Sequence, residues 1–352
     1  MKKKKILVWL SGWVDSAVAA YLLQQQWYEV IAGFMKNYSE PDNPHCTTRQ
    51  DRDAALRVAE HLGITTFIIF DFRKHYQERI IDYIYEGYQK WLTPNPDVFC
   101  NNLIKFDIFL EQALSLWCDY IATGHYAQII SQNNINTLYR GKDEKKDQSY
   151  FLSRLSQYQL DHALLPLWTY TKEEIRVLAK EINLPNADRP DSQGLCFIGD
   201  IPMSEFLRKK LPEQKGDIVD TTGKKVGTHQ GAWFYTLGQR HQLFLPFKAY
   251  VTSIDVKKNI LTVGDKYNEK LVSDSVKVTD RVWTGRDKNF EVLTNCLIKI
   301  RYRQEPAVEG CLKENNQGIL SFSIPETRWI TPGQILVAYT TDRKVLWSGI
   351  IC

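Results

Sequence analysis

The chain has 352 residues, of which 43% are hydrophobic and 24% are charged, and its formal net charge is +4. These values are ordinary for a folded protein of two or three domains, and no apolar run reaches the roughly 18–20 residues of a membrane span. The start, MKKKKILVWLSGWV, is basic and then apolar, but Ser11 and Asp15 interrupt it too early for a signal peptide. None of the seven cysteines forms a CxxC pair, which favours a reducing cytoplasm and gives no spacing for zinc. We expect a cytoplasmic protein with no membrane partner.

Strand and helix patterns alternate in the first part of the chain. The predicted strands are 5–10, 28–34, 64–70 and 119–125, and the predicted helices are 15–25, 51–62 and 103–116. This alternation predicts an α/β fold with a doubly wound parallel sheet. Such sheets bind ligands beyond the carboxyl ends of their strands. The loops LSGWVDS, FMKN and ATGHYA lie at that edge.

The second part of the chain has a different pattern. Residues 171–185 predict another helix, which opens with a capping box formed by Thr171 and Glu174. From about residue 215, short alternating strands are separated by turns, which indicates all-β structure. We therefore expect three domains: an α/β domain at 1–200, a small central β domain at 201–270, and a C-terminal β-barrel at 271–352.

Tryptophan occurs where glycine is expected. A helix that feeds a strand usually ends with one residue in the left-handed conformation, which glycine adopts without steric cost. Gly63 and Asn183 follow this rule at two such joins, whereas Trp27 and Trp117 stand at two others. Our hypothesis is that several tryptophans are glycines whose UGA codons were translated with the wrong table. The alternative is a diverged protein with exposed aromatic residues.

The stretch SGWVDS at 11–16 lies between the first strand and the first helix. With glycine at position 13, its backbone N–H groups and the helix N-terminus form a cradle for phosphate, and Ser11 and Ser16 add hydroxyl donors. Asp15 is a candidate ligand for Mg²⁺ or a helix cap. No GKS or GKT follows, so this is not a Walker loop. The pattern is that of ATP pyrophosphatases, although a merely tight turn is the alternative.

Two cysteines lie in turn-rich loops a few residues after an aspartate. Cys100 follows Asp97 in TPNPDVFCNN, at the start of a helix, where the pKa of a thiol is lowered. Cys196 follows Asp191 in DSQGLCFIG. A single cysteine is more often a small buried apolar residue. Two in this setting are candidates for a persulfide donor and its resolving partner.

Together these segments resemble one enzyme family. SGWVDS, FMKN, TPNPDVFCN, ATGHYA, KDQSYFL, DSQGLCFIG, YTLGQRH, KIRYRQ and TPGQ occur in the order found in tRNA-specific 2-thiouridylases of the ATP pyrophosphatase (PP-loop) superfamily. The resemblance covers nearly the whole chain. It implies ATP-dependent 2-thiolation of the wobble uridine of tRNA, in which the uridine O2 is adenylated and replaced by persulfide sulfur. The family pattern has glycine where this chain has Trp9, Trp13, Trp27, Trp91, Trp117, Trp168 and Trp347.

The resemblance also implies residue roles. Cys196 would carry the persulfide, Cys100 would be the nucleophile that resolves it, and Asp97 would be the general acid/base. The implied ATP site, with Mg²⁺, comprises Trp9, Leu10, Ser11, Gly12, Trp13, Val14, Asp15, Ser16, Met35 and Gly124. The implied tRNA contacts are Asn95, Pro96, Asp97, His125, Lys146, Asp147, Gln148, Arg301, Tyr302 and Gln334. The sulfur donor would be a cysteine desulfurase or a sulfur-relay protein.

Three alternatives stay open at this point. Another PP-loop ATP pyrophosphatase, such as an amide-forming ligase, would not need the paired Cys100 and Cys196. If Trp13 is genuine, its indole fills the phosphate cradle, and the chain is a catalytically inactive tRNA-binding protein. An iron–sulfur cluster held by the two cysteines and Asp97 is a third reading. The sequence indicates neither the tRNA isoacceptors nor the oligomeric state.

Overall fold

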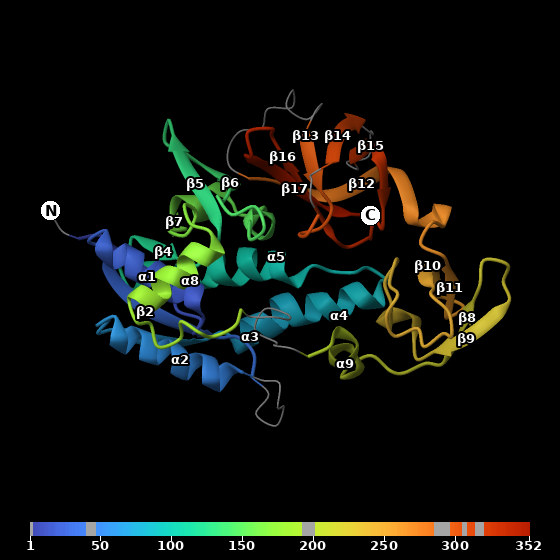
Figure 1. Cartoon of the computed structure of the whole chain (residues 1–352), viewed down its shortest axis with the longest axis horizontal. Coiled ribbons are helices and arrows are strands. Elements are labelled where there is room, and N and C mark those ends of the chain that lie inside the picture. Colours follow the sequence, from blue (N-terminus) through green and yellow to red (C-terminus); the bar gives the residue numbers. More distant parts are fainter. Residues whose placement is uncertain (1–2, 40–46, 192–200, 285–295, 305–307, 314–319) are drawn as a thin grey trace.

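The computed structural model describes residues 3–39, 47–191, 201–284, 296–304, 308–313 and 320–352. It comprises a parallel-sheet domain, a small central sheet and a barrel that lies above the helices of the first domain (Figure 1). This architecture confirms the predicted fold class.

The first domain is built on a five-stranded parallel sheet with the order β3-β2-β1-β4-β7. The strands are β1 (Lys5–Trp9), β2 (Glu29–Lys36), β3 (Phe67–Asp71), β4 (Tyr120–Ala122) and β7 (Ala163–Leu164). The helices are α1 (Val14–Gln25), α2 (Thr48–His61), α3 (Arg73–Tyr76), η1 (Gln77–Ile81), α4 (Asp82–Gln89), α5 (Pro96–Cys100), η2 (Asn101–Ile108), α6 (Phe109–Ser115), η3 (Ser149–Leu152), α7 (Gln157–Asp161), α8 (Lys172–Glu181) and α9 (Met203–Arg208).

The alternation of side chains along β1 explains why helices cover both faces of the sheet. Ile6 and Val8 belong to a core shared with α1, α2 and α8. Leu7 points to the opposite face, into a core shared with residues 72–88 and α6. Because β1 is buried on both sides, its sequence is continuously apolar, as is usual for a central parallel strand.

Two details of this domain differ from the sequence prediction. The helix expected at 103–116 begins at Pro96, because Asn95 accepts a hydrogen bond from the Val98 N–H and proline suits the first helical position. A hairpin of β5 (Ala127–Gln132) and β6 (Ile135–Arg140) was not predicted. It turns at Asn133 and Asn134, whose φ angles of 50° and 59° suit a tight hairpin turn.

From Gly216 onward the described residues form mainly β-structure, as predicted. The central sheet has the order β10-β11-β8-β9 and contains β8 (Gly216–Val219), β9 (Lys225–His229), β10 (Tyr250–Asp255) and β11 (Ile260–Gly264), with η4 at Ala232–Phe234. After η5 (Glu269–Leu271), a closed barrel follows with the order β12-β15-β14-β13-β16-β17. Its strands are β12 (Val272–Trp283), β13 (Cys296–Lys299), β14 (Val308–Lys313), β15 (Leu320–Arg328), β16 (Ile335–Tyr339) and β17 (Val345–Ile351).

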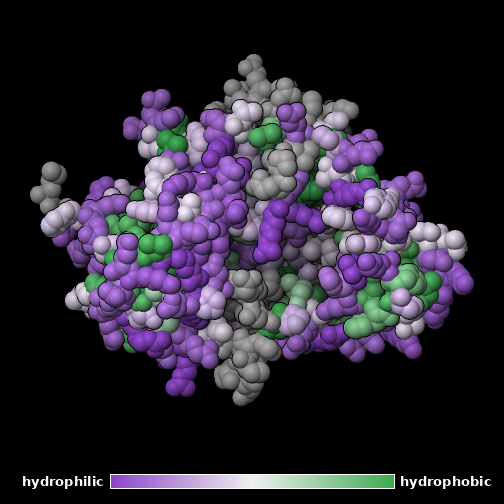
Figure 2. Space-filling view, in the orientation of Figure 1, coloured by the Kyte–Doolittle hydropathy of each residue, from purple (hydrophilic) through white to green (hydrophobic). Residues whose placement is uncertain are grey.

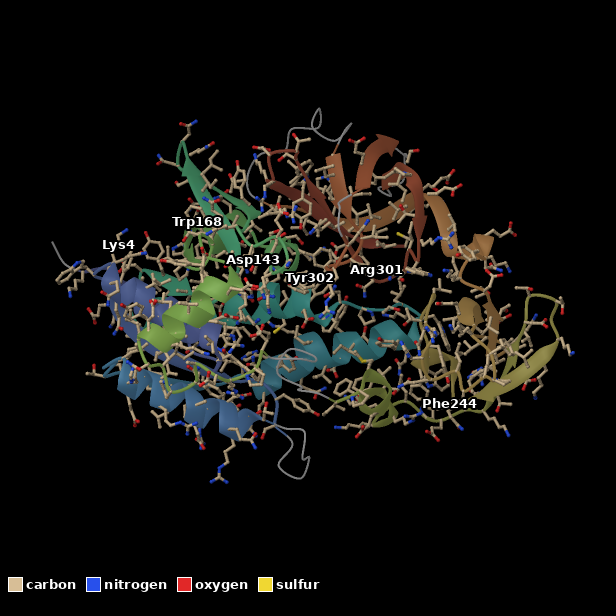
Figure 3. The ribbon with its side chains drawn as sticks, viewed as in Figure 1. Lys4, Asp143, Trp168, Phe244, Arg301 and Tyr302 are labelled. Atoms are coloured by element: carbon tan, nitrogen blue, oxygen red, sulfur yellow. The ribbon has the colours of Figure 1, made fainter. Side chains whose placement is uncertain are left out.

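The surface shown in Figure 2 is largely hydrophilic. Apolar residues gather at its lower right, in the part of the view where Figure 3 labels Phe244 of the central domain. Phe244 is 94% exposed and Phe247 is 49% exposed. No described helix combines the length and apolar character needed to cross a bilayer.

Candidate functional site

The turn after β1 is shaped by its own serine hydroxyls. The Ser11 N–H donates to Oγ of Ser16 at 3.1 Å, and the two hydroxyl oxygens lie 3.0 Å apart. The Ser16 hydroxyl also donates to the carbonyl of Trp13 at 3.0 Å. These bonds wrap the loop around the first turn of α1, so that hydroxyl groups and the helix N-terminus are held together, as anion-binding loops require.

Two glycines allow neighbouring backbones to approach this turn closely. Gly12 has φ +83°, and a Cβ placed on it would lie 2.3 Å from the carbonyl oxygen of Asp51. A Cβ on Gly124 would lie 2.7 Å from the backbone carbon of Asp15. Neither position has room for a larger side chain, so glycine is needed at both for the neighbouring backbones to approach the loop this closely.

A cavity of about 960 Å³ opens at the carboxyl edge of the sheet, where the sequence predicted it. Its lining includes these predicted site residues: Trp9, Ser11, Trp13, Val14, Asp15, Ser16, Met35, Asp97, Gly124, His125, Lys146, Asp147, Gln148 and Tyr302. These predicted residues are not part of the lining: Leu10, Gly12, Asn95, Pro96, Cys100, Arg301 and Gln334. Leu10 is buried in the core instead, where it packs with α1 and α8.

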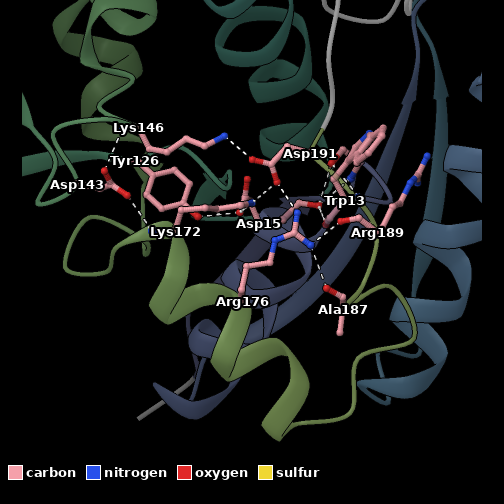
Figure 4. A network of polar contacts seen from close by, with 12 residues as sticks. Trp13, Asp15, Tyr126, Asp143, Lys146, Lys172, Arg176, Ala187, Arg189 and Asp191 are labelled. Carbon is pink, nitrogen blue, oxygen red and sulfur yellow. Dashed lines mark hydrogen bonds and ion pairs between the residues drawn. The ribbon is translucent and has the colours of Figure 1, made fainter. Parts of the chain in front are cut away.

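The indole of Trp13 is part of the cavity wall. The guanidinium carbon of Arg189 lies 3.7 Å from the centroid of its ring. Arg189 also donates to the carbonyl of Gly12 at 3.0 Å and forms an ion pair with Asp51. The aromatic ring and the cation therefore share the space directly above the loop (Figure 4).

A charged network connects this loop with α8 and the segment that follows it (Figure 4). The ammonium group of Lys172 lies 2.6 Å from Oδ1 of Asp15 and 2.8 Å from Oδ1 of Asp191. Asp191 also pairs with Lys146 at 2.5 Å and with Arg176 at 2.6 Å. Burial opposes ionisation of Asp191, but hydrogen bonds from Lys146 and Lys172 prevail and hold its pKa below the usual range.

Asp15 has a second partner on the other side. The Tyr126 hydroxyl donates to its Oδ1 at 2.7 Å, and burial together with the Asp15 charge raises the pKa of Tyr126. A neutral hydroxyl and a cation thus both stabilise the Asp15 carboxylate. Both groups contact Oδ1, so as a ligand for Mg²⁺ Asp15 would have to share that oxygen with them.

His125 lies in the loop after β4, as predicted, and is buried. Its Nδ1 is 2.7 Å from the hydroxyl oxygen of Thr123, and its ring lies 6.0 Å from that of Phe106. Burial and the positive charge of Lys105 keep the pKa of His125 well below its usual value. His125 is therefore neutral at physiological pH and can offer or accept a hydrogen bond without charge.

The structure describes the loop that carries Cys100 but not the loop that carries Cys196. Asp97 and Asn101, which line the cavity, lie three residues before and one residue after Cys100. Cys100 itself is fully buried among core residues, at the last position of α5 rather than at its first turn. Cys196 lies outside the described residues, so its distance from Cys100 stays a prediction.

The predicted tRNA contacts fall into two groups. In the first, Lys146 is paired with Asp191, and the amide oxygen of Gln148 accepts the Tyr126 N–H at 3.0 Å. Asp147 is buried, and its carboxylate accepts hydrogen bonds from Arg140 at 2.8 Å and from the Ser149 N–H at 3.1 Å. The side chain of Asp147 thus holds the loop in place.

The second group joins the first domain to the barrel. The Gln334 amide donates to the carbonyl of Thr93 at 2.8 Å and accepts from the Asn95 amide at 3.3 Å. The Thr93 N–H donates to the carbonyl of Pro332 at 2.8 Å. The start of α5, with the buried Pro96, therefore rests on the barrel.

Arg301 and Tyr302 follow β13 and lie between the two domains (Figure 3). Arg301 donates to the hydroxyl of Thr331 at 3.2 Å, and burial lowers its pKa. The Tyr302 ring packs against that of Phe151, with centroids 4.3 Å apart. Only Tyr302 of this pair lines the cavity.

Several residues of the site are not among those predicted from the sequence. Lys172 and Arg176 lie within the helix predicted at 171–185, and Arg189 follows it. Lys105 is buried, lines the cavity and lies 4.5 Å from the Trp9 ring. The sequence does contain a signal for Lys172, which is its position as the first residue of a helix that begins with a capping box. Among the described residues, no cluster of three or more His, Cys, Asp or Glu side chains is arranged to hold a metal.

Comparison with known proteins agrees with this arrangement. Three family profiles match in succession: "tRNA methyl transferase HUP domain" at residues 4–200, "tRNA methyl transferase PRC-barrel domain" at 204–265, and "Aminomethyltransferase beta-barrel domain" at 273–351. A solved 4-thiouridine synthetase–RNA complex with bound ATP is similar at a TM-score of only 0.37 and 17% identity, over 56% of this chain and 46% of that one. That likeness is too distant to support an argument.

Curated relatives match over almost their entire lengths. The tRNA-specific 2-thiouridylase MnmA 1 of Geobacillus kaustophilus is 42% identical, covering 100% of this chain and 96% of the relative. The MnmA proteins of Lysinibacillus sphaericus (42% identical, 97% and 92% covered) and Shouchella clausii (41% identical, 100% and 98% covered) are equally similar. Because these relatives are 41–42% identical over nearly their full lengths, the chain belongs to the tRNA-specific 2-thiouridylase family.

Proposed function

We propose that this chain is an ATP-dependent tRNA-uridine 2-sulfurtransferase that replaces O2 of the wobble uridine with sulfur. The observation that carries the proposal is the cavity of about 960 Å³ at the carboxyl edge of the sheet. Its floor contains the Ser11 and Ser16 hydroxyls and the N-terminus of α1, and Asp97 contributes to its wall. One cavity thus offers donors for phosphate together with a carboxyl group one helical turn from a cysteine.

The residues of the loop fit ATP as co-substrate. Ser11, Ser16 and the first N–H groups of α1 are donors suited to its phosphates, and the positive end of the helix dipole favours their charge. Lys172 and Arg189 add positive charge at the same rim. We assign no protein ligand to Mg²⁺, which in this proposal enters bound to the nucleotide.

Activation solves the first chemical difficulty, because the uridine O2 is a poor leaving group. In our proposal O2 attacks the α-phosphorus of ATP, pyrophosphate leaves, and the adenylated base can then lose AMP. Asp97 is placed on the cavity wall, where it can accept or return the proton that moves in these steps. The base must leave its stack to enter the cavity, which a single-stranded anticodon loop allows.

Sulfur transfer uses both cysteines. The terminal sulfur of a Cys196 persulfide attacks C2, and AMP leaves with the C2–O2 bonding pair. The Cys100 thiolate then attacks Sγ of Cys196 and forms a disulfide, so the broken S–S bond leaves its electron pair on the 2-thiouridine. A cellular dithiol must reduce the disulfide before the next turnover. We propose that a desulfurase or relay protein that carries a persulfide recharges Cys196.

The tRNA would be held by the two groups of residues described above. His125, Lys146 and Gln148 lie at the cavity, whereas Asn95, Arg301 and Gln334 lie where the barrel meets the first domain. Cations and an aromatic ring at Arg301–Arg303 suit phosphate contacts and base stacking.

The direct test is an assay with a tRNA transcript that has uridine at the wobble position. A matched transcript with cytidine there is the control, and a small persulfide supplies sulfur. We expect ATP-dependent 2-thiouridine, detected by retarded migration in mercury-containing gels, with AMP and pyrophosphate as products. Release of ADP, or thiolation of the cytidine transcript at the same rate, would contradict the proposal.

The alternatives make different predictions. An amide-forming ligase would keep full activity in C100S and C196S variants. A catalytically inactive tRNA-binding protein would retain tRNA and fail to bind radiolabelled ATP. An iron–sulfur enzyme would be brown after anaerobic purification and would lose activity with a chelator.

A further inference from the structure

Five helix ends in the first domain close with the same pair of backbone hydrogen bonds. The residue after the helix cap donates its N–H to the carbonyl three positions back, and the next residue donates to the carbonyl five positions back. The first bond measures 3.0–3.1 Å at Trp27, Gly63, Trp91, Trp117 and Asn183, and the second measures 2.9–3.2 Å. This is the Schellman motif, which requires a left-handed residue at its centre.

The central residues have nearly the same backbone conformation. Their φ angles are +66° at Gly63, +53° at Asn183, and +64°, +61° and +59° at Trp27, Trp91 and Trp117. Glycine and asparagine are the residues that adopt this conformation readily, and a bulky side chain is strained in it. Three of the five positions thus hold a residue that the conformation disfavours.

The tyrosines provide an internal control for aromatic side chains. Trp27, Trp91, Trp117 and Trp329 have positive φ, so four of the ten tryptophans take the disfavoured conformation. All 18 tyrosines lie in the described part of the chain, and none has positive φ. Among the described phenylalanines Phe244 alone has positive φ, at 50°, so among the aromatic residues this conformation recurs only at tryptophan.

At Trp27 and Trp117 burial does not compensate for the strain, whereas Trp91 is partly buried and packs against Trp233. Trp27 is 76% exposed and Trp117 is 88% exposed. A large apolar side chain in water gains no packing energy that offsets an unfavourable backbone. Trp13 is unfavourable in another way, because its ring occupies the cavity wall directly above the phosphate loop, stacked on Arg189.

We propose that the natural protein has glycine at positions 13, 27, 91 and 117, because its gene contains UGA codons that its host reads as glycine. A single reassigned codon explains why one residue type recurs at unrelated glycine positions, whereas independent substitutions would yield different residues. At position 13 the consequence is functional and rests on the proposed function: removal of the indole opens the cradle to phosphate. Trp168 and Trp347 have no such backbone signature, and Trp347 fills the barrel core.

Mass spectrometry of the protein isolated from its native host tests this inference. Fragmentation of peptides that span positions 13, 27, 91 and 117 should give the residue mass of glycine, and the gene should have TGA at each codon. Trp233 is the matched control: it has an ordinary backbone, packs against Trp91 and Phe234, and should retain the mass of tryptophan.

The outcomes separate clearly. Tryptophan mass at 27, 91 and 117 would overturn the inference. Glycine at those three sites with tryptophan at 13 would overturn the claim about the cradle alone. Because the readout is a mass, failure of the proposed enzymatic activity would not affect it.

Discussion

The ammonium group of Lys172 lies 2.6 Å from Oδ1 of Asp15 and, on its other side, 2.8 Å from Asp191. One side chain of α8 thus connects the first turn of α1 with the chain immediately before residue 192. The Lys172 side chain is only 12% exposed, so solvent screens these contacts weakly.

Lys172→Ala should impair both stability and nucleotide use. Loss of the cation leaves two partly buried carboxylates without their shared partner, which we expect to cost about 2–3 kcal/mol of unfolding free energy and to raise the KM for ATP. Lys142→Ala is the matched control, because its ion pair with Glu174 is half exposed and should contribute less than about 1 kcal/mol. Equal effects of the two variants would contradict the assigned role of Lys172.

Cys100→Ser and Cys196→Ser should each lower tRNA thiolation by about a thousand-fold or more, because each removes a proposed nucleophile. Exchange of pyrophosphate into ATP should continue in both variants, since adenylation needs no thiol. Cys118→Ala is a control matched for burial and should keep its activity. Thiolation by the C100S variant at the normal rate would remove Cys100 from the mechanism.

The ion cluster at Asp191 should make stability depend on acid pH. The folded-state pKa of Asp191 is depressed, so its contribution is fully present above the unfolded pKa of about 3.9 and declines as pH falls below it. Urea unfolding should show Asp191→Asn less stable than the unmodified chain at neutral pH, with a difference that narrows towards about pH 3. Asp188→Asn, which changes an exposed residue, should show no such trend.

Trp27→Gly and Trp117→Gly should raise stability, in contrast with most substitutions by glycine. Each relieves left-handed strain of about 1 kcal/mol and loses little packing, because both rings are exposed. Thermal unfolding measures the gain, and Trp233→Gly should lower the midpoint because that ring packs against two others. A lower midpoint for the first two variants would show that the rings contribute packing energy after all.

Gln334→Ala should reduce kcat/KM for tRNA by about ten-fold, since it removes hydrogen bonds worth about 1–2 kcal/mol between the barrel and the loop before α5. Gln24→Ala removes a similar side-chain bond to the carbonyl of Leu62, far from the cavity, and serves as the control. A similar loss of kcat/KM in both variants would indicate a general effect on folding.

The parts of the structure that local physics determines were predictable. The continuous apolar run of β1 and the alternation of strands and helices predict the parallel sheet and its binding edge. The capping box at Thr171 predicts the start of α8. Both bonds of that box are present. The Thr171 N–H donates to the Glu174 carboxylate at 2.6 Å, and the Glu174 N–H donates to the Thr171 hydroxyl at 3.2 Å.

What depends on distant contacts was not predictable. Lys172 and Asp15 are 157 positions apart, and no periodic pattern indicates that they meet. The burial of Cys100 follows from the whole core around α5 rather than from its own loop. The hairpin at 127–140 did carry a local signal, since two successive asparagines favour left-handed turns.

The attachment of α5 to the barrel has a consequence for synthesis of the protein. Thr93 and Asn95 are held by Pro332 and Gln334, which leave the ribosome only after the whole sheet domain. Because domains fold as they emerge, the nascent sheet domain lacks the contacts that hold the start of α5 until the barrel residues have been made. We expect ribosome-bound fragments that end before residue 330 to hold nucleotide but to be unable to modify RNA, so that chemistry begins only after these barrel residues have emerged.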